Sequence, residues 1–303
     1  MPDAAIADMV AVPGGTFRMG SESFYPEERP VRRVAVEAFR IDAHPVTNEQ
    51  FAEFVDATGY VTLAERPVDA ADYPDADPAL LVPGSAVFRE PPGRVDLRSG
   101  VWWAYVPGAS WRRPEGPGSD LAGRERHPVV HVAYEDALAY AQWAGKALPT
   151  EAEWECAARG GLDGATYAWG DERRPGGRTM ANTWEGEFPW QNLRGGGFAR
   201  TSPVGSFPPN GYGLLDVAGN VWEWTADRYD ARPPAHSCCG APQPPAACHG
   251  GEAVDRTAVM VVKGGSHLCA PNYCLRYRTA ARQGEQADTS TSHIGFRCVV
   301  RDA

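Results

Sequence analysis

The pattern of hydrophobic and polar residues predicts short β-strands in the first forty residues and in one later segment. Residues 9–20 contain two apolar-rich stretches on either side of Pro13-Gly14-Gly15, a combination typical of a turn, so we expect two strands there. Residues 31–41 alternate in part and predict a further strand. The mainly apolar residues 129–132 predict a buried strand.

Helical spacing of apolar residues occurs in three segments. The first follows a capping box at Thr47–Gln50 and should end at Gly59, because glycine readily adopts the left-handed conformation that closes a helix. A second helix is expected over residues 134–144. A third should run from another capping box at Thr150 to Gly160.

Most of the remaining chain has no regular period. Residues 66–123 are irregular but include the aromatic segment 101–105, which is more typical of a binding surface than of a flexible tether. The 33 glycines and 27 prolines indicate many loops, and the 10 tryptophans and 11 tyrosines supply large side chains to pack them. We predict one α+β domain over residues 1–303, low in regular secondary structure, with its core at about 9–301.

Composition and charge narrow the classes of partner. Lys and Arg number 29 against 39 Asp and Glu, a net charge of −10, which argues against nucleic acid as a partner. No apolar run approaches the roughly 18 residues of a membrane-spanning helix. The first residues are acidic and lack the basic region of a secretory signal, so we expect a cytoplasmic protein whose seven cysteines are reduced.

The pair Cys269 and Cys274 is the most informative local feature. Pro271 between them excludes a helix, so a loop must carry both thiols. Spacing alone leaves three interpretations open: a disulfide or redox pair, a site for a soft metal, or two unrelated core thiols. Two thiolates without further strong ligands suit Cu(I) better than zinc. His267 could be another ligand or a hydrogen-bonded structural group.

Two further segments carry charged groups at suggestive positions. Asp216 and Glu223 lie seven residues apart on a turn rich in Gly and Asn, which either binds Ca²⁺ through hard oxygen ligands or is a solvated turn. Arg276 and Arg278 alternate with apolar residues, as in a strand with one cationic face. That face would be a solvated edge or the wall of a groove beside the cysteine pair.

The other cysteines show no catalytic pattern. Cys238, Cys239 and Cys248 lie in a Pro-rich segment and are interpreted as surface or partly buried thiols. Cys156, in a predicted helix, and Cys298, in a predicted strand, are interpreted as core residues. The sequence also lacks a nucleophile elbow, a P-loop, a dinucleotide fingerprint and a zincin motif, which excludes the commonest hydrolases, kinases and dehydrogenases.

The segment Gly264–Arg278 closely resembles the active-site segment of formylglycine-generating enzymes, the sulfatase-modifying factors, of bacterial type. The resemblance extends over most of the chain and is carried by residues 13–20, 148–155, 210–214, 219–224 and 295–298. The Cys-x4-Cys pair after Gly-Gly-Ser narrows it to the formylglycine branch. The iron-binding His-x3-His-x-Glu pattern of the related sulfoxide synthases is missing.

The resemblance implies a C-type-lectin-like fold and a specific reaction. Enzymes of this family use O2 to oxidise a cysteine, within a Cys-x-Pro-x-Arg motif of an unfolded sulfatase, to Cα-formylglycine. Cys269 and Cys274 match the thiols that hold Cu(I), the substrate thiol is the third ligand, and loss of a hydrogen from the substrate Cβ leads to a thioaldehyde that is hydrolysed. The pocket residues implied are Ser266, Trp222 and Tyr273 for oxygen and substrate, with Arg276 and His293 for substrate binding.

The resemblance also implies structural calcium. The ligands of one family site match Asp216, Gly219, Val221 and Glu223, the middle two through backbone carbonyls. Of a second site, Asn182, Thr183 and Phe198 are present, but Gly196 stands where the family has an acidic ligand, so we expect no divalent ion there. Thr279 replaces a cysteine that forms a disulfide in exported relatives, which agrees with a cytoplasmic protein. We expect a monomer, and the alternative function is that of a non-catalytic, lectin-like binding or regulatory member.

Overall fold

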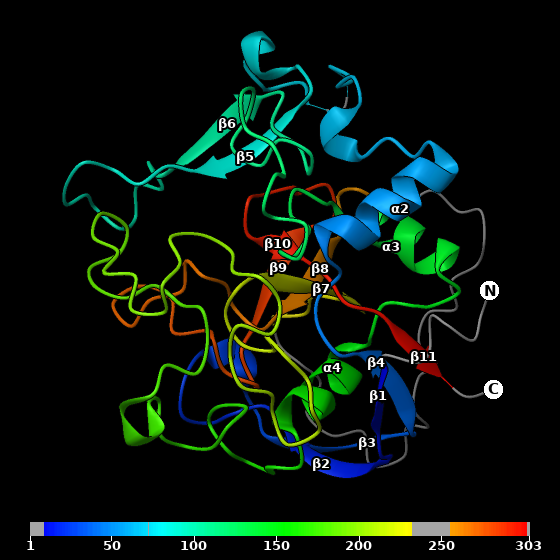
Figure 1. Ribbon diagram of the computed structural model, residues 1–303, viewed down its shortest axis with the longest axis vertical. Helices are drawn as coiled ribbons and strands as arrows, with labels where there is room; N and C mark the ends of the chain where they lie inside the picture. Colours follow the sequence, from blue (N-terminus) through cyan, green and yellow to red (C-terminus); the bar gives the residue numbers. More distant parts are fainter. Residues whose placement is uncertain (1–8, 72, 232–254, 302–303) are drawn as a thin grey trace.

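The computed structural model describes residues 9–71, 73–231 and 255–301. Its centre is a four-stranded sheet with the order β10-β7-β8-β9, in which β10 is parallel to β7 and the other neighbours are antiparallel (Figure 1). The strands are β7 (Trp222–Arg228), β8 (Val259–Lys263), β9 (Arg282–Gln286) and β10 (Ile294–Gly295). The cysteine pair lies in the loop between β8 and β9, so this sheet supports the loop at both ends.

A second sheet joins the two ends of the described chain. In it β4 (Phe39–Asp42) lies between β1 (Met9–Val12) and β11 (Val299–Arg301), antiparallel to both. Two hairpins complete the strands: β2 (Gly15–Met19) with β3 (Arg32–Val36), and β5 (Gly84–Phe88) with β6 (Trp103–Pro107). The β5–β6 hairpin stands out at the upper left of Figure 1.

The three predicted helices are present. They are α2 (Asn48–Thr58), α3 (Tyr134–Trp143) and α4 (Glu151–Arg159). The capping boxes at Thr47 and Thr150 form, and Gly59 and Gly160 end their helices in the left-handed conformation. Helix α4 contacts β7 and β8 on one side and the β2–β3 hairpin on the other, so it joins the central sheet to the lower part of the molecule in Figure 1.

Two strand predictions were wrong. Residues 31–41 form two strands in different sheets, because the chain turns after β3 where it passes against Gly14; a Cβ there would lie only 2.7 Å from the Ala38 nitrogen. Residues 129–132 are buried as expected but are not a strand. His131 has a φ of 61°, which interrupts an extended segment, and its N–H donates to the Thr291 carbonyl instead.

Two further expectations about strands also need correction. Cys298 is buried but directly precedes β11 instead of lying in a strand, whereas Cys156 lies within α4 as predicted. Residues 275–278 form no strand with a cationic face, because Arg278 is fully buried against Glu28. Cys238, Cys239 and Cys248 lie outside the described residues.

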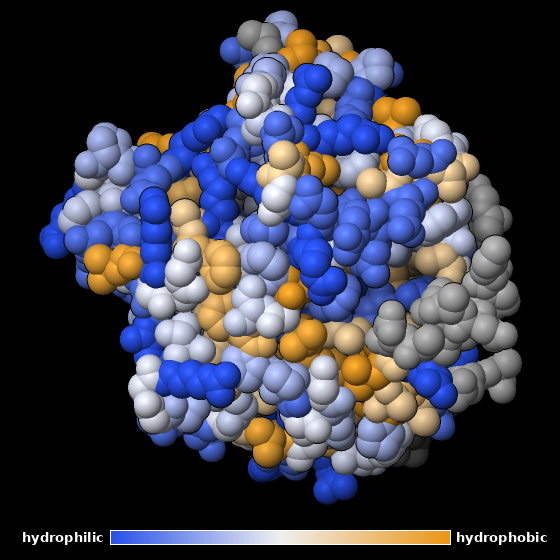
Figure 2. Space-filling model, in the orientation of Figure 1, coloured by the Kyte–Doolittle hydropathy of each residue, from blue (hydrophilic) through white to orange (hydrophobic). Residues whose placement is uncertain are grey.

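The core is built largely of aromatic side chains. Its largest cluster includes Phe51, Trp111, Trp224 and Phe296, and the cysteine pair belongs to this same cluster. On the face seen in Figure 2, hydrophobic residues gather only in small patches among polar ones. Among the described residues, no helix combines the length and the apolar composition needed to cross a bilayer.

Candidate active site around a buried cysteine pair

A cavity of about 320 Å³ opens beside the central sheet. Its walls come from the β8–β9 loop, from β9, from the aromatic segment at β6 and from the residues before β10. All seven residues predicted for substrate chemistry line it: Trp222, Ser266, Cys269, Tyr273, Cys274, Arg276 and His293. The structure therefore brings together residues that are up to 71 positions apart in the sequence, from 222 to 293.

Short backbone hydrogen bonds fold the loop that carries the thiols. The N–H of Cys269 donates to the Ser266 carbonyl at 2.9 Å, and the N–H of Cys274 donates to the Ala270 carbonyl at 2.9 Å. The two turns place the Sγ atoms of Cys269 and Cys274 3.0 Å apart. Both cysteines are free, and the separation exceeds the roughly 2.05 Å of a disulfide bond. The interpretation as two unrelated core thiols is wrong.

The two thiols have different acidities. The hydrogen bond from Cys269, together with the nearby Arg276 guanidinium, lowers the pKa of Cys274 to about 7. Arg276 Nη1 lies 4.0 Å from the Cys274 Sγ. Burial and the same thiol–thiol hydrogen bond raise the pKa of Cys269 well above its usual range. The pair therefore holds one thiolate near neutral pH, stabilised by the proton of the other.

A segment from the other end of the chain holds the arginines that follow the cysteines. Arg276 donates to Glu27 at 2.6 Å, and its guanidinium lies 3.8 Å from the centroid of the Tyr25 ring. Arg278 pairs with Glu28 in the same way. Glu27 and Glu28 belong to the 3₁₀ turn η1 (Pro26–Glu28), about 250 residues away in sequence. No local pattern announced this clamp, because it depends on a long-range contact.

The remaining predicted residues have distinct environments. The Tyr273 ring stacks on Phe188 with centroids 4.4 Å apart and 8° between planes. His293 shares a 2.6 Å hydrogen bond through Nδ1 with Thr291, and burial lowers its pKa to about 3, so its ring is neutral. His267 does not line the cavity; its Nδ1 bonds the Asn220 carbonyl at 2.8 Å. The structural interpretation of His267 is the one its contacts support.

Sequence reasoning missed part of the cavity wall. Gln283 and Glu285, on β9, both face the cavity, but they lie beyond the motif that carries the resemblance. Trp102 and Trp103 fall within the aromatic segment that was expected to form a binding surface. A signal for Glu285 exists only in three dimensions, because β9 pairs with β8 and so returns to the thiol loop.

The Asp216–Glu223 turn is more engaged within the protein than calcium binding alone requires. Both Glu223 oxygens accept hydrogen bonds from Arg297, at 2.7 and 2.8 Å, and one also accepts from Trp154 Nε1. Asp216 Oδ2 accepts from the Gly205 N–H at 2.7 Å, and burial raises the Asp216 pKa to about 6. The described residues contain no group of three or more His, Cys, Asp and Glu side chains placed to hold a metal ion.

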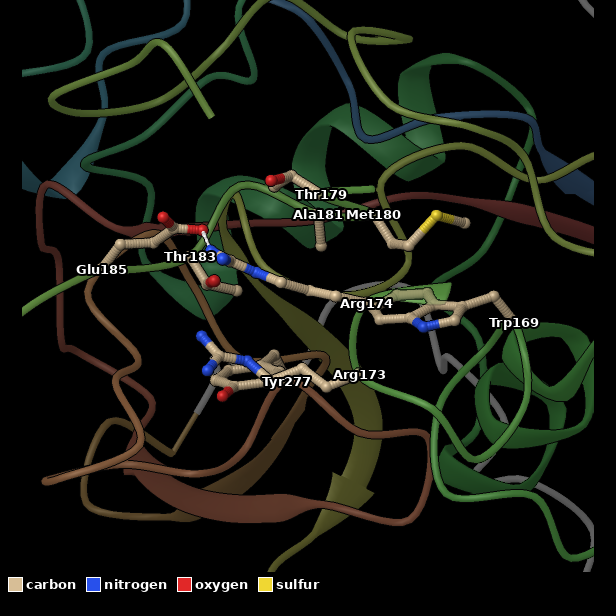
Figure 3. Close-up of a pocket in the computed structure, with 9 residues that line it drawn as sticks. All are labelled: Trp169, Arg173, Arg174, Thr179, Met180, Ala181, Thr183, Glu185 and Tyr277. Carbon is tan, nitrogen blue, oxygen red and sulfur yellow. Dashed lines mark hydrogen bonds and ion pairs between the residues drawn. The ribbon is translucent and has the colours of Figure 1, made fainter. Parts of the chain in front are cut away.

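The region of the second expected calcium site is cationic on one side. Thr183 lines a small cavity of about 10 Å³ together with Arg173 and Arg174 (Figure 3). Arg174 pairs there with Glu185. The Asn182 amide donates to the Arg200 carbonyl at 2.8 Å. Two guanidinium groups beside Thr183 disfavour a divalent cation, which agrees with the prediction from Gly196.

Comparison with known proteins assigns the chain to a family. A family model described as the sulfatase-modifying factor enzyme 1-like domain matches residues 1–302. Over 300 residues the chain is 58% identical to the formylglycine-generating enzyme of Mycobacterium tuberculosis, covering 97% of this chain and 98% of that protein. The chain belongs to the sulfatase-modifying factor family. The likeness confirms the predicted class of enzyme, a formylglycine-generating oxidase.

Two other similar proteins show how far family membership reaches. The chain is 41% identical to the inactive C-alpha-formylglycine-generating enzyme 2 of Bos taurus, covering 96% of this chain and 87% of that protein. The structure of PvdO from Pseudomonas aeruginosa superposes with a TM-score of 0.64 at 24% identity, covering 97% of this chain and 95% of that one. The predicted fold is thereby confirmed. Because the family includes an inactive protein, the cavity's own side chains decide what this chain can do.

Proposed function

We propose that the chain oxidises a cysteine in a Cys-x-Pro-x-Arg motif of an unfolded sulfatase to Cα-formylglycine, with O2 as oxidant and Cu(I) as cofactor. The observation that carries this proposal is the pair of free thiols, 3.0 Å apart in the wall of a cavity of about 320 Å³. A purely binding module has no need for two converging thiols. The predicted alternative, a lectin-like binding or regulatory protein, has no such observation in its favour.

The donor set of the cavity fits Cu(I). Cys269 and Cys274 would hold the ion, since soft thiolate ligands select Cu(I) over harder cations. The lowered pKa of Cys274, to about 7, makes one thiolate available at neutral pH. When bound, copper supplies a site at which a thiol and O2 react. No carboxylate or imidazole competes at the thiols, because the charged neighbour is the Arg276 guanidinium.

The chain's own residues would position the peptide and limit access of water. The aromatic rings of Trp102, Phe188 and Tyr273 contact one another and form an apolar wall. Neutral His293 and Ser266 offer uncharged polar groups beside the thiols. The substrate carbon loses two electrons and a hydrogen, and water then replaces sulfur with oxygen to give the aldehyde.

Calcium at the Asp216–Glu223 turn is proposed as a separate, structural ion. Two buried carboxylates and the carbonyls of Gly219 and Val221 are suitable hard ligands. Arg297 already neutralises Glu223, so the ion would chiefly balance Asp216. We expect this calcium to stabilise the fold without taking part in the reaction.

The test is a peptide assay with the full chain. The protein is loaded with Cu(I) and incubated with O2, a thiol reductant and a Cys-x-Pro-x-Arg peptide, and the product is examined by mass spectrometry. We expect the peptide mass to fall by the difference between a thiol and an aldehyde, and a hydrazine probe to label the product. A peptide that binds with unchanged mass, in the presence of copper and O2, would contradict the proposal and favour the binding module.

A further inference from the structure

Glu285 is the one acidic side chain among the described residues that line the thiol cavity. It lies on β9, the edge strand of the central sheet, opposite Met260 of β8. The cavity has one basic lining residue, Arg276. Because the thiols, the aromatic rings and Glu285 line the same cavity, a peptide that places its cysteine at the thiols passes within reach of this carboxylate.

The charge of Glu285 has no counter-charge in the protein. Gln283 Nε2 donates to Glu285 Oε1 at 2.5 Å, and this neutral amide is its hydrogen-bonding partner. Among the described residues Glu285 forms no ion pair, and its Oε2 accepts no hydrogen bond. Burial raises its pKa, as expected for a carboxylate that has lost water without gaining a cation.

Arg276 is not available to neutralise it. Its guanidinium donates to Glu27 at 2.6 Å and lies over the Tyr25 ring, 3.8 Å from the centroid. The cavity therefore has a cation that is already paired and an anion that is not. A buried carboxylate held by one neutral donor, with its other oxygen open to a cavity, is suited to a ligand that brings its own positive charge.

We propose that Glu285 selects a guanidinium-bearing side chain in the peptide substrate, four residues after the reacting cysteine. This inference rests on the proposed function. Four residues of extended chain span up to about 13 Å, so a peptide held at the thiols can place such a side chain elsewhere in the cavity. A carboxylate accepts two parallel hydrogen bonds from a guanidinium, and the indole rings of Trp102 and Trp103 offer faces on which that planar group can stack.

The inference assigns to Glu285 the substrate-binding role that the sequence predicted for Arg276. Like charges repel, so Arg276 cannot bind a substrate arginine, and its contacts with Glu27 and Cys274 occupy it otherwise. Gln283 is a positioning residue, because its amide fixes one oxygen of the carboxylate and leaves the other toward the cavity.

The experiment compares two peptides, Cys-x-Pro-x-Arg and Cys-x-Pro-x-Gln, with the wild type, Glu285→Gln and Glu37→Gln. Glu37 lies exposed in the turn between β3 and β4, so its substitution makes the same charge change away from the cavity. We expect the wild type and Glu37→Gln to have a KM at least tenfold lower for the Arg peptide. Glu285→Gln should lose this preference by raising KM for the Arg peptide alone, with kcat changed less than threefold.

A charge reversal provides an independent gain of function. Glu285→Arg should convert a Cys-x-Pro-x-Glu peptide better than the wild type does, and the Arg peptide worse. The melting temperature of Glu285→Gln should not fall, because the substitution removes a buried charge without a partner. Equal KM values of the wild type for the Arg and Gln peptides would overturn the inference, whether or not any variant folds. So would an unchanged preference in Glu285→Gln.

Binding without chemistry separates this inference from the proposed function. Calorimetry with a Ser-x-Pro-x-Arg peptide, which has no thiol to oxidise, measures recognition alone. A tenfold weaker Kd for Glu285→Gln than for the wild type, absent with the Ser-x-Pro-x-Gln peptide, supports selection by Glu285 even if no aldehyde forms with any peptide. Equal Kd values for the two peptides overturn it even if the aldehyde does form.

Discussion

Glu223 and Glu285 lie in the same four-stranded sheet, on β7 and β9, yet the protein treats their charges in opposite ways. Glu223 is 1% exposed and accepts three hydrogen bonds, two from Arg297 and one from Trp154. Glu285 has one neutral partner and faces a cavity. The two carboxylates are separated by a single strand, β8.

The difference distinguishes groups that hold the fold from groups left for a ligand. A buried ion pair that is fully hydrogen-bonded costs stability when one partner is removed, because the other charge stays buried alone. A buried polar group without such partners is uncommon in native proteins and marks a candidate functional site. The Glu223 region is satisfied internally, whereas the cavity wall keeps a thiolate and a carboxylate unsatisfied.

The largest effect should come from the thiols. Replacing Cys269 or Cys274 with Ser should abolish peptide conversion, because a hard hydroxyl oxygen is a poor ligand for Cu(I). The fold should survive, with a melting temperature within a few degrees of the wild type, since the change is isosteric. Activity is measured by the peptide assay, copper by metal analysis of the purified protein and stability by thermal unfolding.

The matched controls are the other cysteines. Cys238→Ser, Cys239→Ser and Cys248→Ser should retain activity, as expected for surface or partly buried thiols without a role in the reaction. Either active-site variant retaining copper and near-wild-type turnover would break the distinction between the cavity and the rest of the molecule.

The next largest effect should be on stability, at Glu223. Glu223→Ala leaves the fully buried Arg297 without its carboxylate, which costs about 3–5 kcal/mol of unfolding free energy. In a domain of this size that lowers the melting temperature by about 10 °C. Differential scanning calorimetry in a chelator should already show the loss, because the ion pair exists without calcium. A variant as stable as the wild type in chelator would make Glu223 a calcium ligand first.

Asp216→Asn should have a smaller effect, whose sign depends on calcium. The pKa of Asp216 is raised from 3.8 to about 6, chiefly by burial. The folded state then binds more protons than the unfolded state between these values, so the free energy of unfolding falls as pH rises through this range and stays lower above it. In chelator at pH 7.5, Asn removes this penalty of up to about 3 kcal/mol and should raise the melting temperature by several degrees.

Calcium should reverse that order. If the ion binds at the turn, it stabilises the wild type by binding only the folded state, and the Asn variant gains less. Asn also tolerates the φ of 53° at this position, so backbone strain does not confound the comparison. Melting temperatures of both proteins at pH 5 and 7.5, with calcium and with chelator, complete the test. Parallel shifts of the two proteins on adding calcium would contradict a site that uses Asp216.

Local signals in the sequence were sufficient for the helices but not for all of the strands. Capping boxes at Thr47 and Thr150 act within one turn of helix, so they could be predicted from adjacent residues. The break at His131 and the turn after β3 arise from contacts with Thr291 and Gly14, far away in the sequence. A pattern over ten residues contains no information about such partners.

The site divides in the same way. The thiol pair could be predicted because both cysteines and their turn occupy one short loop, and the resemblance supplied Trp222 and His293. The Glu27–Arg276 clamp and the carboxylate of Glu285 could not, because β9 and the η1 turn reach the cavity only through tertiary packing. What remained unpredicted is therefore the electrostatic setting of the thiols.

The smallest effect should be at Tyr273, which distinguishes packing from chemistry within the cavity. Its ring is 42% exposed and stacks on Phe188, so it offers an apolar face at the cavity wall. Tyr273→Phe keeps this stack, and we expect kcat/KM within about threefold of the wild type if the ring acts by packing against the peptide. Tyr273→Ala removes the stack and should raise the peptide KM several-fold with little change in kcat. Steady-state kinetics with the Cys-x-Pro-x-Arg peptide measures both variants. A large fall in kcat for Tyr273→Phe would instead show that the hydroxyl takes part in the reaction, and would add a third polar group to those that the cavity leaves unsatisfied.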